Sequence, residues 1–98
     1  MHILTVLYGP PDDPAAFESY YATTHGPLVD KIGGLSGWTS RLIASMDDNP
    51  PPYYRIAELS FDSLEALQSS MGSAEGQAAV NDIPNFASGG VTTFVAHD

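Results

Sequence analysis

The chain has 98 residues, which fits one domain over residues 1–98, and twelve acidic against three basic residues give a net charge of −9. It contains no cysteine, which excludes disulfides, thiolate metal sites and a cysteine nucleophile. Nucleic acids and anionic membrane surfaces are not expected partners, because both are bound mainly through Lys and Arg.

The first segment predicts a strand followed by a helix. Residues 2–8 (HILTVLY) are mainly β-branched and aliphatic, and the glycine and two prolines after them indicate a turn. Asp13 before Pro14 is the pairing of N-cap and first-turn proline that starts helices. One face of this helix then carries side chains at helical spacing: Phe17, Tyr20, Tyr21, Thr24 and Leu28.

A break in this helix is expected at Gly26-Pro27, with a short second piece over residues 28–32. The glycines of residues 33–37 indicate a loop that leads into a second strand over residues 38–44. Residues 46–52 (MDDNPPP) predict a rigid acidic turn, because proline cannot donate a hydrogen bond to a neighbouring strand.

A third strand is predicted over residues 53–61, where apolar and polar side chains alternate. Asp62 and Glu65 have the spacing of a capping box, which predicts a helix with Asp62 as its N-cap. The apolar stripe of this helix stops at Gly72, where we expect the left-handed conformation that ends many helices.

A helical piece over residues 73–81 and a strand over residues 91–97 complete a βαββαβ order. This order suits a ferredoxin-like α+β fold, in which a four-stranded antiparallel sheet of order 4-1-3-2 carries its helices on one face. The other face is then bare, so we expect a homodimer packed sheet against sheet into an α+β barrel. A monomer with a polar second face is the alternative, since Glu58 and Ser60 fall there.

The strand directions of this topology collect five residues at one rim of the domain: His2, His25, Trp38, Glu58 and His97. Three histidines in one place suggest a metal site. No two of them have the spacing of ligands on one helix or strand, and two lie at chain ends, so we expect no metal. The chain also lacks a phosphate-binding loop and a Ser-His-Asp signature.

Four stretches in chain order resemble the EthD family: residues 17–29, 32–37, 57–67 and 81–86. The first holds an aromatic pair followed by the tetrapeptide His-Gly-Pro-Leu, and the second is a glycine loop. This resemblance implies a dimeric α+β barrel with a small, mostly apolar pocket for a ring-shaped or oxygenated carbon skeleton, and no cofactor. Gly33 stands where the family usually has proline and Ser60 where relatives often have tryptophan, which bears on the shape of the pocket.

His25 is the leading candidate for chemistry. The end of a helix favours its charged form, and a pKa near 6.5 suits proton transfer at neutral pH. The resemblance adds that the matching histidine is a hallmark of the family, whereas the alternative is a histidine that only caps the helix. Tyr21 is the expected hydrogen-bond partner, and Tyr20 lies about 100° away around the helix.

Aromatic and apolar side chains are expected to wall the pocket: Phe17, Tyr20, Leu28, Trp38 and Phe86. Each of them is equally suited to an ordinary core. We expect the pocket between the first helix and the sheet, inside each subunit, because a helix presents one stripe to one face of a sheet. Phe86 would be its lid. Glu58 is expected to pair with Arg41 or Arg55, to orient His25 or to reach solvent.

These features favour a cofactor-independent enzyme of isomerase, cyclase, dehydratase or decarboxylase type, with His25 as general acid and base. The substrate would be small, apolar and oxygenated. The alternatives are a non-catalytic carrier of a hydrophobic metabolite and a structural subunit without a pocket. We expect a cytoplasmic protein, because no apolar run reaches the ~20 residues of a membrane span and the N-terminus lacks a basic region.

Overall fold

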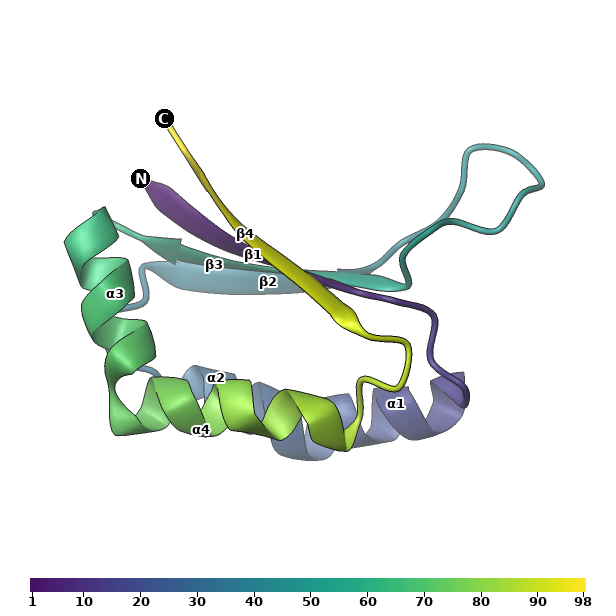
Figure 1. Cartoon of the computed structure of the whole chain (residues 1–98), viewed down its shortest axis with the longest axis horizontal. Coiled ribbons are helices and arrows are strands. Elements are labelled where there is room, and N and C mark those ends of the chain that lie inside the picture. Colours follow the sequence, from purple (N-terminus) through teal and green to yellow (C-terminus); the bar gives the residue numbers. More distant parts are fainter.

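The computed structural model describes residues 1–98 and has two layers, a sheet and a set of helices that cover one of its faces (Figure 1). Its elements are β1 (His2–Tyr8), α1 (Pro14–Tyr20), the π-helix η1 (Tyr21–His25), α2 (Gly26–Asp30), β2 (Gly37–Leu42), β3 (Arg55–Phe61), α3 (Leu64–Gly72), α4 (Ala74–Asp82), the 3-10 helix η2 (Ile83–Asn85) and β4 (Val91–His97). All strand pairs are antiparallel and the sheet order is β2-β3-β1-β4. This confirms the predicted ferredoxin-like α+β fold.

The first helical segment begins as its sequence predicts but does not break where expected. The Asp13 side chain caps α1 by accepting a hydrogen bond from the backbone N–H of Ala16. Gly26 and Pro27 lie within α2, and Gly26 has helical backbone angles. The expected interruption is therefore wrong. A π-turn takes its place, in which the N–H of Gly26 donates to the carbonyl of Tyr21.

Pro27 gives a physical reason for this π-turn. A proline inside an α-helix lacks the N–H of the regular ladder, and its ring crowds the carbonyl four residues earlier. One wider turn relieves that crowding without ending the helix. The chain thus continues in helical conformation from Pro14 to Asp30.

The second pair of helices uses serines as caps. Ser63 rather than Asp62 is the N-cap of α3, because its Oγ accepts a hydrogen bond from the Ala66 N–H. Gly72 does not adopt the predicted left-handed conformation. Ser73, in extended conformation, instead separates α3 from α4 and caps α4. The boundary between the two helices is therefore set by the Ser73 cap and not by a left-handed glycine.

The strand register assigns each side chain to one face of the sheet, because directly opposed residues share a face. The face toward the helices carries the buried core residues of β3, which are Ala57, Leu59 and Phe61. The outer face carries a mixed set, which includes Ile3, Thr5, Leu7, Thr39, Arg41, Ile56, Glu58, Ser60, Thr92, Phe94 and Ala96.

Glu58 lies at the middle of this outer face, opposite Thr5 on one side and Thr39 on the other. It forms no ion pair within the chain, so the expected pairing with an arginine is wrong. Arg55 faces the helices and pairs with Glu18 instead. Because Glu58 and the helices lie on opposite faces of the sheet, it does not orient His25.

The expected rim with three histidines is also wrong. His2 and His97 are register partners whose rings stack with centroids 5.0 Å apart, at the ends of the chain. His25 lies in the middle of the helical layer, because the helix continues past it. No group of three or more potential ligands is positioned to hold a metal ion. None of the helices has the length and hydropathy needed to cross a membrane.

Candidate functional site

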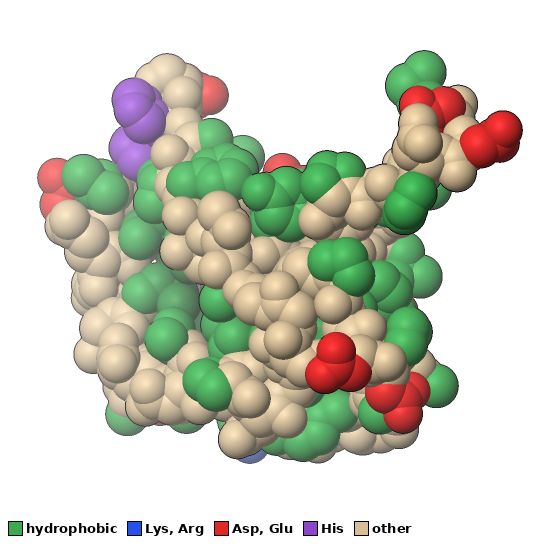
Figure 2. All heavy atoms as spheres, turned by 45° about the vertical axis from the view of Figure 1, so that its right-hand side comes forward, with side chains coloured by type: hydrophobic (Ala, Val, Ile, Leu, Met, Phe, Trp, Pro, Cys, Tyr) green, Lys and Arg blue, Asp and Glu red, His purple; other side chains and the backbone are tan.

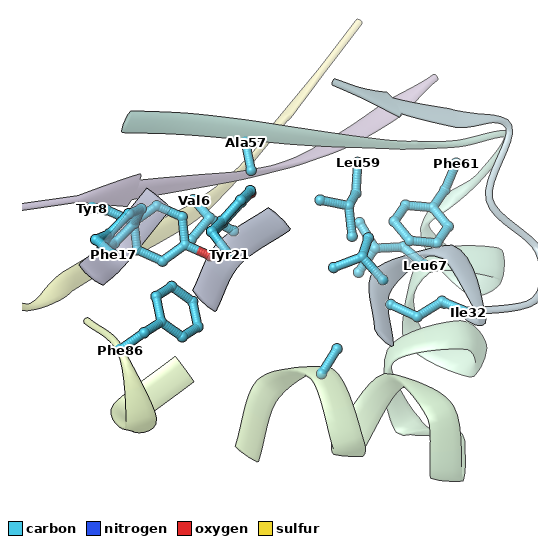
Figure 3. Packing of buried hydrophobic residues seen from close by; sticks show 12 residues of the cluster. Val6, Tyr8, Phe17, Tyr21, Ile32, Ala57, Leu59, Phe61, Leu67 and Phe86 are labelled. Carbon is cyan, nitrogen blue, oxygen red and sulfur yellow. The ribbon is translucent and has the colours of Figure 1, made fainter. Parts of the chain in front are cut away.

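A cavity of about 440 Å³ lies between the helical layer and the sheet. Its size falls in the range of small-molecule pockets, roughly 300–1,000 Å³. Of its 17 lining residues 14 are hydrophobic, and they come from β1, β3 and β4 above and from η1, α2, α3, α4 and η2 below, with Ile32 in the loop after α2. Figure 3 shows two groups of core side chains: a mainly aromatic one at one end and, at the other, a mainly aliphatic one that also holds Phe61. Both groups contribute to the cavity wall, which includes Tyr8, Tyr21, Ile32, Leu59 and Leu67.

The π-turn brings His25 to this cavity. Side chains four residues apart on a regular α-helix are rotated by about 40° relative to each other. A series of residues at this spacing therefore winds around the helix and does not stay on one face. Here the side chains at a constant spacing of four are all buried, namely Phe17, Tyr21, His25 and Val29. The wider η1 turn removes the drift, and it places His25 against the core rather than on the flank of the helix.

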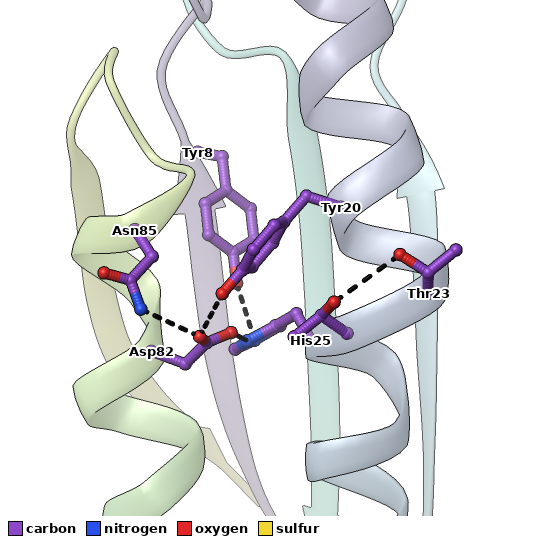
Figure 4. A network of polar contacts seen from close by, with 7 residues as sticks. Tyr8, Tyr20, Thr23, His25, Asp82 and Asn85 are labelled. Carbon is purple, nitrogen blue, oxygen red and sulfur yellow. Dashed lines mark hydrogen bonds and ion pairs between the residues drawn. The ribbon is translucent and has the colours of Figure 1, made fainter.

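A hydrogen-bond network surrounds the His25 imidazole, which is only 3% exposed (Figure 4). Its Nδ1 lies 3.0 Å from Oδ2 of Asp82, at the end of α4. The other carboxylate oxygen of Asp82 accepts hydrogen bonds from the Tyr20 hydroxyl, at 2.6 Å, and from the Asn85 amide, at 3.1 Å. The imidazole Nε2 lies 3.5 Å from the Tyr8 hydroxyl, at the end of β1. Three elements distant in sequence thus meet at one side chain.

The environment of this pair sets its protonation. Burial lowers the pKa of His25 below 6.5, and the Asp82 carboxylate opposes this shift without cancelling it. Burial alone would raise the pKa of Asp82, but the hydrogen bonds from Tyr20, Asn85 and His25 outweigh it and hold that pKa below its usual value. At neutral pH the pair is a carboxylate and a neutral imidazole. The expectation that a helix end favours the charged histidine is wrong, because His25 is inside the helix.

Asp82 also selects the tautomer of the neutral imidazole. A carboxylate only accepts hydrogen bonds, so Nδ1 carries the proton and Nε2 presents its lone pair to the Tyr8 hydroxyl; His25 and Tyr8 both line the cavity. Burial raises the pKa of Tyr8, and Tyr21 raises it further, so the Tyr8 hydroxyl keeps its proton and acts as a donor. A base and a hydrogen-bond donor therefore stand side by side in an apolar wall.

Tyr21 contributes its ring rather than its hydroxyl. The ring lines the cavity with its centroid 5.4 Å from that of His25. Its hydroxyl accepts a hydrogen bond from Ser40 at 2.9 Å, and the Arg55 guanidinium lies over the ring. The hydroxyl within hydrogen-bond distance of His25 is that of Tyr8, which was expected only as a strand residue.

The other expected wall residues lie outside the cavity lining: Phe17, Tyr20, Leu28, Trp38 and Phe86. Phe86 packs against the His25 ring and stacks on Tyr20, so it supports the network instead of forming a lid. Trp38 donates its indole N–H to Asp30 at 2.8 Å. Asp82 was not among the expected site residues, although it lies in the stretch of residues 81–86 that resembles the EthD family. Its approach to His25 spans 57 residues, which no local pattern encodes.

The burial of His25 makes stability depend on pH. Its pKa is below 6.5 in the folded chain, so the unfolded chain binds more protons as the pH falls through that value. We expect the free energy of unfolding to have its highest value above pH 6.5, where the histidine is neutral in both states. It should decrease as the pH is lowered from about 7 towards about 5. Urea unfolding at several pH values measures it. His25→Gln should flatten the profile, whereas His97→Gln should not, and equal profiles for both would contradict the assignment.

Comparison with known proteins gives consistent results. The EthD domain model matches residues 9–90. An uncharacterized 11.0 kDa protein in the thcB-thcC intergenic region of Rhodococcus erythropolis is 42% identical over 92 residues, which are 94% of this chain and 89% of that protein. The crystal structure of an EthD family protein from Bacillus halodurans has a TM-score of 0.93 at 33% identity and covers 100% of this chain and 98% of its own. A protein of unknown function from Jannaschia, described as dimeric and ferredoxin-like, shares the fold with a TM-score of 0.74, 11% identity and full coverage of both chains.

Proposed function

Because this chain belongs to the EthD family and has its ferredoxin-like α+β fold, we propose that it is a cofactor-independent enzyme for a small, apolar, oxygenated substrate. The observation that supports this proposal is the neutral imidazole of His25, which is held by Asp82, has its Nε2 beside the Tyr8 hydroxyl and lines an apolar cavity. A base in this setting needs no further group to be activated, since its pKa and tautomer are already set.

The chemistry follows from the two groups at the wall. The Nε2 lone pair of His25 removes a proton from a carbon next to a carbonyl, or from a hydroxyl, and the imidazolium returns it at another position. Asp82 stabilises the imidazolium while it exists. The Tyr8 hydroxyl donates a hydrogen bond to the oxygen on which negative charge develops. Isomerisation, cyclisation and dehydration all share this proton transfer.

Proton exchange tests this proposal without knowledge of the natural substrate. A small ketone such as acetophenone is incubated with the protein in deuterated water, and incorporation of deuterium next to the carbonyl is followed by NMR. The wild-type chain should accelerate exchange above the buffer rate. A chain that binds the ketone and leaves the buffer rate unchanged would contradict the enzymatic function.

A carrier of a hydrophobic metabolite is the second candidate, and the composition of the cavity wall favours it, since 14 of 17 lining residues are hydrophobic. A carrier needs affinity but no base. The two candidates differ in the exchange experiment, because a carrier binds the ketone without exchanging its protons. The two candidates also predict different effects of replacing His25. If the protein is a carrier, the replacement should leave the dissociation rate of the bound ligand unchanged.

We also propose that two copies associate through the outer face of the sheet. This face exposes Phe94 and carries Ile3, Leu7 and Ile56 beside it. Apolar side chains on a sheet face without helices are typical of interfaces between subunits. The Jannaschia protein of the same fold is described as dimeric, which agrees with such an assembly.

Replacing Phe94 with aspartate should dissociate this dimer. Phe94 is 47% exposed in the single chain, so the substitution leaves the core intact while it places a charge in the proposed interface. Leu64→Asp is a matched control, because Leu64 is 40% exposed at the start of α3, away from the outer face. Sedimentation equilibrium should show a dimer for the wild type and the control and a folded monomer for Phe94→Asp. A wild type that is monomeric at micromolar concentration would overturn the proposal.

A further inference from the structure

None of the cationic side chains of the chain faces the cavity. The three of them are Lys31, which is exposed, Arg41, which lies on the outer face of the sheet, and Arg55. Arg55 is held by two hydrogen bonds to the Glu18 carboxylate, at 2.6 and 2.8 Å, and by one to Ser40. The cavity lining includes no lysine or arginine. An anionic ligand group would therefore find no counter-charge there.

The charge next to the cavity is negative instead. The Asp82 carboxylate lies directly behind His25, whose imidazole is neutral and does not compensate it. The C-terminal end of α4, with its partial negative charge, points to the same place, and Ile83 and Pro84 after it line the cavity. The whole chain carries a net charge of −9, and the view of Figure 2 shows acidic side chains on its surface and almost no basic ones. These charges repel an anion in an environment that screens little.

A cationic ligand is not favoured in its place. The Asp82 carboxylate already accepts hydrogen bonds from Tyr20, Asn85 and His25, so its oxygens are occupied. The remaining wall is almost entirely apolar, and a charge transferred from water into such surroundings without a partner is strongly destabilised. Only uncharged oxygen groups are matched: a ligand that replaces the long 3.5 Å contact between Tyr8 and His25 can accept from the Tyr8 hydroxyl through a carbonyl or donate to Nε2 through a hydroxyl.

We propose that the cavity selects uncharged ketones, aldehydes, lactones or alcohols and rejects carboxylates and amines of the same shape. This inference rests on the proposed function, because it takes the cavity to be the ligand site. It narrows that function to isomerases, cyclases and dehydratases, since a decarboxylase would have to bind a free carboxylate.

Three probes of one shape and different charge test the selectivity. Acetophenone is neutral, benzoate carries one negative charge and benzamidinium one positive charge, and all three are planar with similar volume. Their dissociation constants are measured at neutral pH by NMR titration of the wild-type chain. We expect acetophenone to bind about tenfold or more tightly than either ion. Equal or tighter binding of benzoate or benzamidinium would overturn the inference and leave the proposed function standing.

Two variants connect the selectivity to its cause. Val80 lines the cavity and is 42% exposed, so Val80→Lys adds a cation at the wall without disturbing the core. It should improve benzoate binding, whereas the matched surface variant Ala78→Lys should not, because Ala78 is exposed on nearly the opposite side of α4 and does not line the cavity. Asp82→Asn should narrow the difference between acetophenone and benzoate by removing the negative charge. If none of the probes binds the wild type in a way that Ala79→Phe abolishes, the cavity is not a ligand site and both proposals fall.

Discussion

Replacing His25 with glutamine should lower deuterium exchange of a bound ketone by about 10²- to 10⁴-fold, the usual contribution of a general base. Glutamine preserves a polar side chain of similar reach and can still donate a hydrogen bond to Asp82, but it has no basic lone pair that titrates near neutral pH. Ketone affinity, measured by the same NMR titration, should change little. The loss therefore belongs to the chemical step rather than to binding.

Two controls separate this effect from unfolding. His97→Gln changes an exposed histidine outside the cavity and should retain the wild-type exchange rate. Asp82→Asn keeps the shape of the carboxylate but no longer requires the proton on Nδ1, so its exchange rate should fall as well, with the fold intact by circular dichroism. A folded His25→Gln chain with wild-type exchange would exclude His25 as the base.

Enlarging Ala79 to phenylalanine should abolish ligand binding and leave the chain folded. Ala79 is buried on α4 and faces the cavity, so a ring at this position occupies space that a ligand needs. Filling an apolar cavity also restores dispersion contacts, and we expect the thermal midpoint to rise by a few degrees (about 1 kcal/mol) if the ring fits without strain. Titration with acetophenone and differential scanning calorimetry measure the two effects.

Ala78→Phe is the matched control for this substitution. Ala78 precedes Ala79 on the same helix but is exposed and does not line the cavity. It should therefore bind acetophenone like the wild type. Retained binding in the Ala79→Phe chain would show that the ligand occupies another place.

Most of the fold could be predicted because it follows from local patterns. Alternation in β3, the aliphatic run of β1 and the Asp13 cap each act over a few residues, and their order leaves few topologies. The predicted break of the helix at Gly26-Pro27 was wrong, because the rule that glycine and proline end helices takes no account of tertiary packing. Burial of the side chains on both sides of this pair keeps the segment helical. The π-turn accommodates the proline ring and at the same time keeps these side chains buried.

Only some of the site residues could be predicted from the sequence. His25 and Tyr21 were identified from their position on one helix face, and both line the cavity. Asp82 and Tyr8 reach His25 from other elements, 57 and 17 residues away, and their distances depend on how helix and sheet pack. A single sequence contains no signal for such a contact. The protonation of His25 was misjudged for the same reason, since it depends on burial.

The π-turn of η1 has a consequence for how the length of this segment can vary. The buried positions Phe17, Tyr21, His25 and Val29 are separated by four residues each. Removing one residue between Tyr21 and His25 would change the separations to four, three and four, the pattern of a regular α-helical face. A single-residue deletion elsewhere in a helix rotates everything after it by about 100°. Here a deletion would only convert the π-turn into a regular α-helical turn, so the residues after it would still face the core. A homologue that lacks one residue at this point can therefore keep the same buried positions, with its histidine rotated about the helix axis by less than about 100°.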